Sequence, residues 1–166
     1  NLCRLMAKVK GWRYRWPFVD NMAFGGYNKH FRPARTTRDW LTKDERIVDA
    51  YLADERCTFL FTLNGYYNLF HSIEEASKPE NLQKMPMDLP VLFVSGAEDP
   101  VGNFGKGVEQ VRKAFQAVGM EDVTWILYEN DRHEILNETD RATVYKDLYA
   151  WLYVRMNDPR RKTGGK

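Results

Sequence analysis

The fold follows from two segments of the chain, Leu89-Pro-Val-Leu-Phe-Val-Ser-Gly-Ala-Glu-Asp-Pro100 and Tyr128-Glu-Asn-Asp-Arg-His-Glu-Ile-Leu136. The first contains the continuous apolar run 91–95, which is typical of a buried parallel strand. The second begins where the apolar run 123–128 ends, and this run predicts a neighbouring strand. Between the two runs, residues 105–118 carry valine and phenylalanine at helical spacing. Strand, helix and strand within about 40 residues form a βαβ unit, so we expect the two strands to be parallel.

Each predicted strand is followed by a side chain suited to acid–base chemistry. Asp99 lies four residues after Ser95, and His133 lies five residues after Tyr128. Sites in open parallel sheets form beyond the carboxyl ends of the strands, so we expect both side chains at the same edge. A carboxylate there accepts a hydrogen bond from Nδ1–H of the histidine and leaves Nε2 as a base. Each residue alone also fits an ordinary turn, but the pair, acid before histidine, favours two members of a catalytic triad.

The chain divides into three regions: a helical region at 1–85, an α/β region at 86–157 and a basic tail at 158–166 that we expect to be flexible. In the first region the spacing of apolar residues predicts helices at 1–10, 42–52, 58–70 and 72–76, and an aromatic-rich loop or broken helix at 13–31. Thr42 and Glu45 match a capping box, with Thr42 as the N-cap. Asn64-Gly65 predicts an interruption of the 58–70 helix. The last helix is expected at 139–155, with four buried residues: Val144, Leu148, Trp151 and Leu152.

Motifs in both main regions resemble the α/β-hydrolases, in particular the branch of serine aminopeptidases, monoacylglycerol lipases and lysophospholipases. In the α/β region the similar motifs are Ser95-Gly-Ala-Glu-Asp-Pro-Val-Gly102, Phe104-Gly-Lys-Gly-Val108 and Arg132-His-Glu-Ile-Leu-Asn-Glu138. In the helical region they are Phe18-Val-Asp-Asn-Met-Ala-Phe-Gly25, Tyr27-Asn-Lys29 and Arg38-Asp-Trp-Leu-Thr42, which are similar to the lid of bacterial members. The resemblance implies the C-terminal portion of an α/β-hydrolase fold, with a helical cap followed by parallel strands and flanking helices.

The resemblance also implies site residues, with Asp99 as the triad acid and His133 as the triad base. The family's nucleophile is a serine in a Gly-x-Ser-x-Gly turn that precedes the cap. The sequence contains three serines, Ser72, Ser77 and Ser95, and none has glycine at both flanking positions of that motif. The oxyanion hole next to that turn is missing with it. We therefore expect the chain alone to be inactive and the nucleophile to lie in a missing N-terminal half.

Aromatic residues of the cap are candidates for contacts with an acyl group, although each one also fits a plain packing role between helices. The candidate substrate-binding residues are Phe24, Tyr27, Phe31 and Phe61. We expect no metal, because the spacing of Asp131, His133 and Glu134 matches no zinc pattern. The implied reaction needs no cofactor. Basic and aromatic residues alternate at 8–16, as on a nucleic-acid-binding surface, but the net charge of the chain is only +2, so we expect no nucleic acid and at most peripheral membrane contact.

Composition limits the class of protein. Hydrophobic residues make up 43% of the chain and aromatic residues 14%, which is typical of a folded domain. The longest apolar runs have about six residues, far fewer than the roughly 20 of a membrane-spanning helix. We find no secretory signal and expect a cytoplasmic protein in which Cys3 and Cys57 are reduced.

The expected function is that of a C-terminal fragment of a serine hydrolase of carboxylic esters, with a lysophospholipid or a monoacylglycerol as substrate. Two alternatives stay open. The fragment could be an inactive module that associates with itself, or with the missing half, through an exposed sheet edge. The complete fold could also perform different chemistry, as in epoxide hydrolases, dehalogenases or aminopeptidases, because only the absent half carries the nucleophile.

Overall fold

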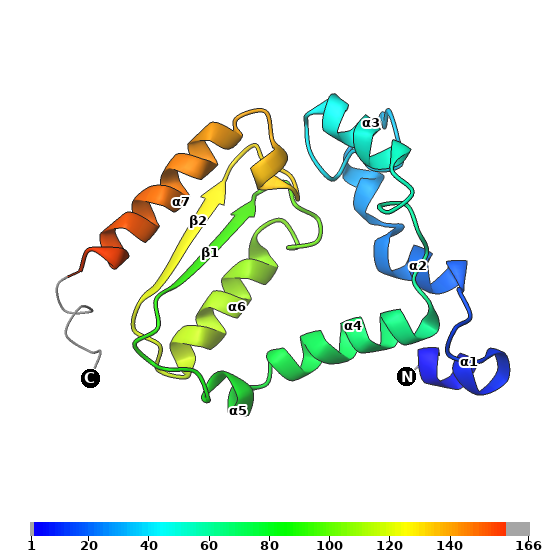
Figure 1. Ribbon diagram of the computed structural model, residues 1–166, viewed down its shortest axis with the longest axis horizontal. Helices are drawn as coiled ribbons and strands as arrows, with labels where there is room; N and C mark the ends of the chain where they lie inside the picture. Colours follow the sequence, from blue (N-terminus) through cyan, green and yellow to red (C-terminus); the bar gives the residue numbers. More distant parts are fainter. Residues whose placement is uncertain (1, 159–166) are drawn as a thin grey trace.

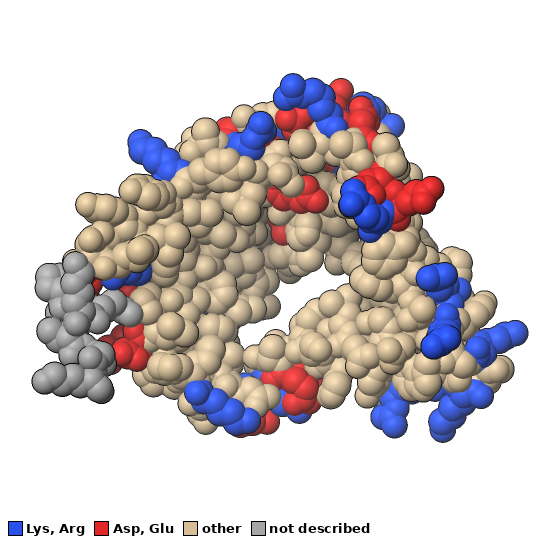
Figure 2. All heavy atoms as spheres, in the orientation of Figure 1, with Lys and Arg blue, Asp and Glu red and all other residues tan. Residues whose placement is uncertain are grey.

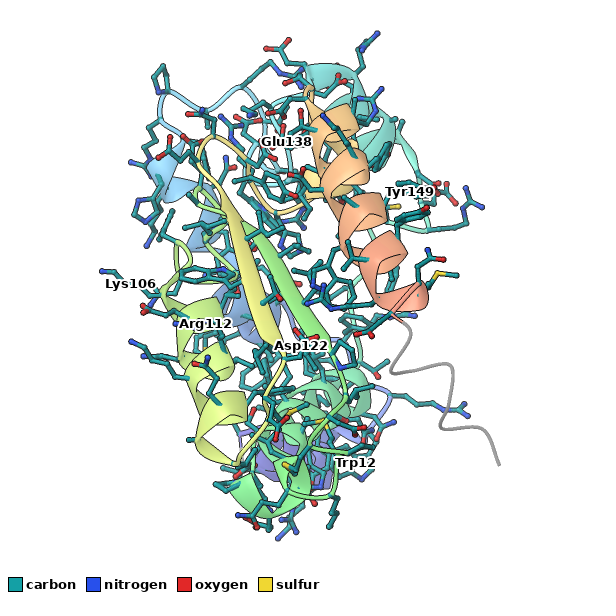
Figure 3. The ribbon with its side chains drawn as sticks, turned by 90° about the vertical axis from the view of Figure 1, so that its left-hand side faces the viewer. Trp12, Lys106, Arg112, Asp122, Glu138 and Tyr149 are labelled. Carbon is teal, nitrogen blue, oxygen red and sulfur yellow. The ribbon has the colours of Figure 1, made fainter. Side chains whose placement is uncertain are left out.

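The computed structural model describes residues 2–158, so most of the predicted tail 158–166 lies outside the described residues. Its centre is a pair of parallel strands, β1 (Val91–Gly96) and β2 (Val123–Tyr128), in register from Val91 opposite Val123 to Gly96 opposite Tyr128. Helices α6 (Lys106–Ala117) and α7 (Arg141–Met156) lie on opposite faces of the strand pair (Figures 1 and 3). The predicted α/β class and both predicted strands are confirmed.

Helix α7 contacts the sheet through a narrower set of residues than the sequence predicted. Val144 is fully buried, but Leu152 is 50% exposed, so its predicted burial is wrong. One turn after Trp151, Arg155 rather than an apolar residue faces the sheet, and its Nη2 donates to Oδ1 of Asp122 at 2.6 Å. An ion pair at the start of β2 therefore replaces apolar packing at this end of the helix.

The first region is helical, as predicted, with different bounds. It contains α1 (Leu2–Lys10), α2 (Pro17–Phe24), the 3₁₀ helix η1 (Tyr27–His30), α3 (Glu45–Ala53), α4 (Leu63–Ala76) and α5 (Pro79–Leu82). Its core consists of Cys3, Ala7, Val19, Leu63 and Tyr66. Figure 1 shows these helices as an arc that leaves the strand pair at α5 and returns to its upper end at α3.

Three predictions about the helices of this region are wrong. Asp44, not Thr42, is the N-cap of α3, because its side chain accepts the backbone N–H of Arg46. Thr42 is buried, and its hydroxyl instead donates to the carbonyl of Asn137 at 3.2 Å. The predicted break at Asn64-Gly65 is absent, since Thr62 caps α4 by accepting the N–H of Gly65 at 3.1 Å. The segment predicted as a separate helix at 72–76 is the end of α4.

Among the described residues, β1 has a strand partner on one side only. The space-filling view shows an opening between the strand unit and the arc of helices (Figure 2). The first four residues of β1 are only half buried. Within residues 2–158, no helix combines the length and apolarity that a crossing of the bilayer would require.

Candidate active site

Asp99 and His133 meet beyond the carboxyl ends of the two strands. Nδ1 of His133 lies 3.1 Å from Oδ2 of Asp99. The other carboxylate oxygen, Oδ1, accepts the backbone N–H of Val101 at 2.8 Å, so the turn after β1 orients the carboxylate. Asp99 is buried at 7% exposure, whereas the side chain of His133 is 38% exposed. With Nδ1 directed at the carboxylate, Nε2 is the nitrogen left to exchange a proton with a bound molecule.

The turn that carries Asp99 needs glycine at the end of β1. A Cβ on Gly96 would collide with the backbone of Asp131 and Arg132. This close approach lets the N–H of Glu98 donate to the carbonyl of Asp131 at 2.9 Å. We call the turn that carries Asp99 the acid turn, and residues 131–138 the histidine loop. Gly96 therefore sets the distance between these two segments.

The histidine loop is attached to a segment of the helical region, residues 39–43. The backbone N–H groups of His133 and Glu134 donate to the carbonyls of Trp40 and Leu41 at 3.4 and 2.7 Å. The ring of Trp40 lies 5.2 Å from the ring of His133. Nη1 of Arg132 donates to the carbonyl of Asp39 at 2.6 Å. Segment 39–43 thus fixes the position of the histidine from the side of the helical region.

A fully buried carboxylate, Glu138, ties the same two segments together. Its Oε1 accepts the N–H of Arg132 at 2.8 Å, and its Oε2 accepts the N–H of Lys43 at 3.0 Å. Both acceptors face backbone donors that would otherwise be buried without partners.

Three carboxylates of the histidine loop and the following turn, Asp131, Glu138 and Asp140, have oxygens within 4.8 Å of one another. The ammonium of Lys43 lies 3.0 Å from Asp131 and 3.9 Å from each of the other two, so a lysine supplies the positive charge here. Burial raises the pKa of Asp131, and Lys43 opposes that rise. Burial disfavours the charge of Lys43, but the hydrogen bond to Asp131 and the neighbouring carboxylates outweigh it and raise its pKa.

The four predicted substrate-binding residues lie at different distances from the Asp–His pair. The ring of Tyr27 packs 5.1 Å from Trp40, and burial together with the charge of Asp99 raises the pKa of its hydroxyl. The ring of Phe31 lies 4.3 Å from the guanidinium of Arg132. Phe24 and Phe61 instead pack against Tyr66 in the helical core, at 6.2 and 5.5 Å.

A cavity of about 600 Å³ lies beside the site. Phe31 lines it together with His30, Phe104, Arg132, Glu98 and Lys43. Of the four predicted residues, Phe31 is the one that reaches this cavity. His30 of the helical region and Phe104, which follows the turn with Asp99, have rings 4.5 Å apart, and neither was predicted from the sequence. Neither has a partner nearby in the sequence that would have indicated the contact.

Comparison with known proteins is consistent with this architecture. A family model described as serine aminopeptidase, S33, matches residues 2–140. No curated protein matches the chain. A thermostable carboxyl esterase from Bacillus coagulans, solved in complex with glycerol, superposes with a TM-score of 0.83 at 22% identity over 92% of this chain. A lipase in an open form superposes with a TM-score of 0.72 at 24% identity over 84% of this chain.

The chain spans 50% of the length of that esterase and 45% of that lipase. At these identities the two structures show the fold, and the family model shows the relationship in sequence. The chain belongs to the serine aminopeptidase S33 family of α/β-hydrolases.

Proposed function

We propose that this chain supplies the acid and the base of a serine-type hydrolase of carboxylic esters. The contact between Nδ1 of His133 and Oδ2 of Asp99 is the observation that carries the proposal. Asp99 holds the imidazole in the tautomer with its proton on Nδ1 and stabilises the imidazolium once it forms. Nε2 of His133 then has a free lone pair with which to accept the proton of a nucleophile.

The nucleophile is a serine on a segment outside this sequence. Ser95, the serine closest to the site in sequence, is buried, and its hydroxyl donates to the carbonyl of Gly96 at 3.2 Å. In the complete enzyme the serine oxygen attacks the ester carbonyl while Nε2 of His133 takes its proton. His133 returns that proton to the leaving alcohol, and water then releases the acid by the same route.

The proposed substrates are lysophospholipids or monoacylglycerols. Phe31 and Phe104 form an apolar part of a cavity whose lining is otherwise mostly charged, and a molecule with an apolar chain and a polar headgroup suits such a lining. A peptide or another ester is the alternative substrate class, and a panel of acyl glycerols, lysophospholipids and aminoacyl amides distinguishes them by kcat/KM.

A fluorophosphonate probe tests the proposed roles in the protein that contains the upstream segment. We expect labelling in the parent and its loss in Asp99→Asn and His133→Ala. The matched controls are Asp54→Asn, which changes a carboxylate at the end of α3 paired with exposed Arg56, and His71→Ala on α4; neither residue lines the cavity beside the site. Both controls should label normally. Full labelling of Asp99→Asn and His133→Ala would remove this pair from the mechanism.

A further inference from the structure

The first helix and the loop after it expose an apolar surface that the proposed chemistry does not use. We define the α1 surface as the exposed residues of segment 2–18. Its large apolar members are Leu2, Leu5, Val9, Trp12, Tyr14 and Phe18. Leu5 and Val9 are 66% and 75% exposed, so most of each side chain lies outside the protein.

Helix α1 is apolar on two sides. Cys3 and Ala7 are buried on the side that packs in the helical core with α4. Leu2, Leu5 and Val9 follow one another at spacings of three and four residues, so they form a stripe of their own along the helix. A helix that only covers a core carries polar residues away from that core. The exposed stripe therefore indicates a second apolar contact.

Within segment 2–18 all charges have one sign, whereas Glu74 and Glu75 of α4 line a cavity that also includes Leu2 and Arg4. Five exposed cations lie in the same segment: Arg4, Lys8, Lys10, Arg13 and Arg15. No aspartate or glutamate occurs before Asp20, and that carboxylate is engaged by the hydroxyl of Tyr66 at 2.5 Å. None of the five cations forms an ion pair within the described part of the chain. Figure 2 shows basic side chains gathered at the α1 end of the molecule with no acidic side chain among them.

We infer that the α1 surface binds the surface of an anionic lipid bilayer. An interfacial helix places its apolar residues at the boundary between headgroups and acyl chains and its lysines and arginines at the lipid phosphates. Trp12 and Tyr14, each with an apolar ring and a polar atom, suit the headgroup level. The uniform positive charge complements an anionic surface, and it distinguishes this patch from the rest of a chain whose net charge is only +2. The inference does not rest on the proposed hydrolysis.

Co-sedimentation of the purified chain with lipid vesicles tests the inference. We expect binding to vesicles of mixed phosphatidylcholine and phosphatidylglycerol, weaker binding as salt is raised, and little binding to phosphatidylcholine alone. The variant Lys8→Glu/Arg13→Glu should weaken binding by roughly twentyfold or more, given the contribution of each cation near an anionic surface.

Two further variants separate charge from apolar contact. Leu5→Gln/Val9→Gln keeps every charge and should also weaken binding. Because both side chains are exposed, we expect this variant to keep the fold, which circular dichroism checks. Lys106→Glu/Lys146→Glu makes the same change in net charge on α6 and α7, where Lys106 projects outward (Figure 3), and should bind like the parent. Equal losses in the two charge variants would overturn the inference. Absence of binding to anionic vesicles, or binding to a single-stranded oligonucleotide in its place, would overturn it as well.

Discussion

The buried carboxylate of Glu138 accepts the backbone N–H of Arg132, the residue immediately before His133, at 2.8 Å. Its second oxygen accepts the N–H of Lys43 in the segment from the helical region. One side chain thereby closes the histidine loop on itself and joins it to the helical region. The position of the proposed base depends on this carboxylate although it does not touch the imidazole.

Replacement of Glu138 by glutamine should loosen the loop. An amide NH₂ would face one of two backbone donors, so at least one buried N–H would lose its acceptor, and we expect a loss of about 1–3 kcal/mol in the free energy of unfolding. Urea denaturation measures it. Glu134→Gln is the matched control, because the carboxylate of Glu134 accepts an exposed hydrogen bond from the nearby side chain of Asn137. This change should alter stability by no more than about 0.5 kcal/mol. Equal losses in the two variants would contradict the role given to Glu138.

Substitution of Gly96 by alanine should displace the histidine loop. The added methyl group meets the backbone of Asp131 and Arg132, which cannot move aside as a flexible side chain would. We expect destabilisation of about 1–3 kcal/mol, as for overpacking of a core, and loss of probe labelling in the longer protein. Gly26→Ala adds a methyl group to open space and serves as the control. Normal labelling of Gly96→Ala would show that the loop tolerates the shift.

Removal of the ion pair between Lys43 and Asp131 should make the free energy of unfolding depend on pH. Lys43→Met removes the cation beside a carboxylate that is 1% exposed, and we expect a loss of about 2–3 kcal/mol at neutral pH, less than for a fully buried pair because the Lys43 side chain is 26% exposed.

The sign of the pH effect follows from the pKa of Asp131, which burial raises above its ordinary value of 3.8. Without Lys43 this pKa rises further, so the folded variant holds a proton that the unfolded chain releases. Its stability is therefore greatest at low pH and falls as pH rises through the folded pKa. Urea denaturation at several pH values should show the deficit of Lys43→Met shrinking towards pH 4. The double variant Lys43→Met/Asp131→Asn should not show this dependence of stability on pH. If the stability loss of Lys43→Met were the same at every pH, protonation of Asp131 would not be coupled to folding.

The strands, the flanking helices and the meeting of Asp99 with His133 follow from local patterns that the sequence displays directly. One apolar run of strand length fixes the position of the turn that carries the carboxylate. A second such run fixes the position of the loop that carries the histidine. The attachment of segment 39–43 to the histidine loop could not be predicted in this way. Thr42 donates to the carbonyl of Asn137 and Glu138 accepts from the N–H of Lys43, each across 95 positions of sequence. The first of these contacts replaces the predicted role of Thr42 as a helix cap. The same contact explains why the cap of α3 moves to Asp44.

Tyr128, the last residue of β2, should lose its hydroxyl proton only at high pH and should stabilise the fold below that pH. Burial, the negative charge of Asp147 and the hydrogen bond to it raise the pKa of Tyr128 to about 12, above the ordinary value of 10.0. A raised pKa means that this contribution is complete below pH 10 and is lost as pH rises through about 12. Tyr128→Phe should therefore cost about 1 kcal/mol at neutral pH, and the cost should vanish at the alkaline end. Absorbance at the tyrosinate band should show one group fewer titrating at high pH in this variant than in the parent. An unchanged titration curve in Tyr128→Phe would contradict the raised pKa of Tyr128 and its hydrogen bond to Asp147.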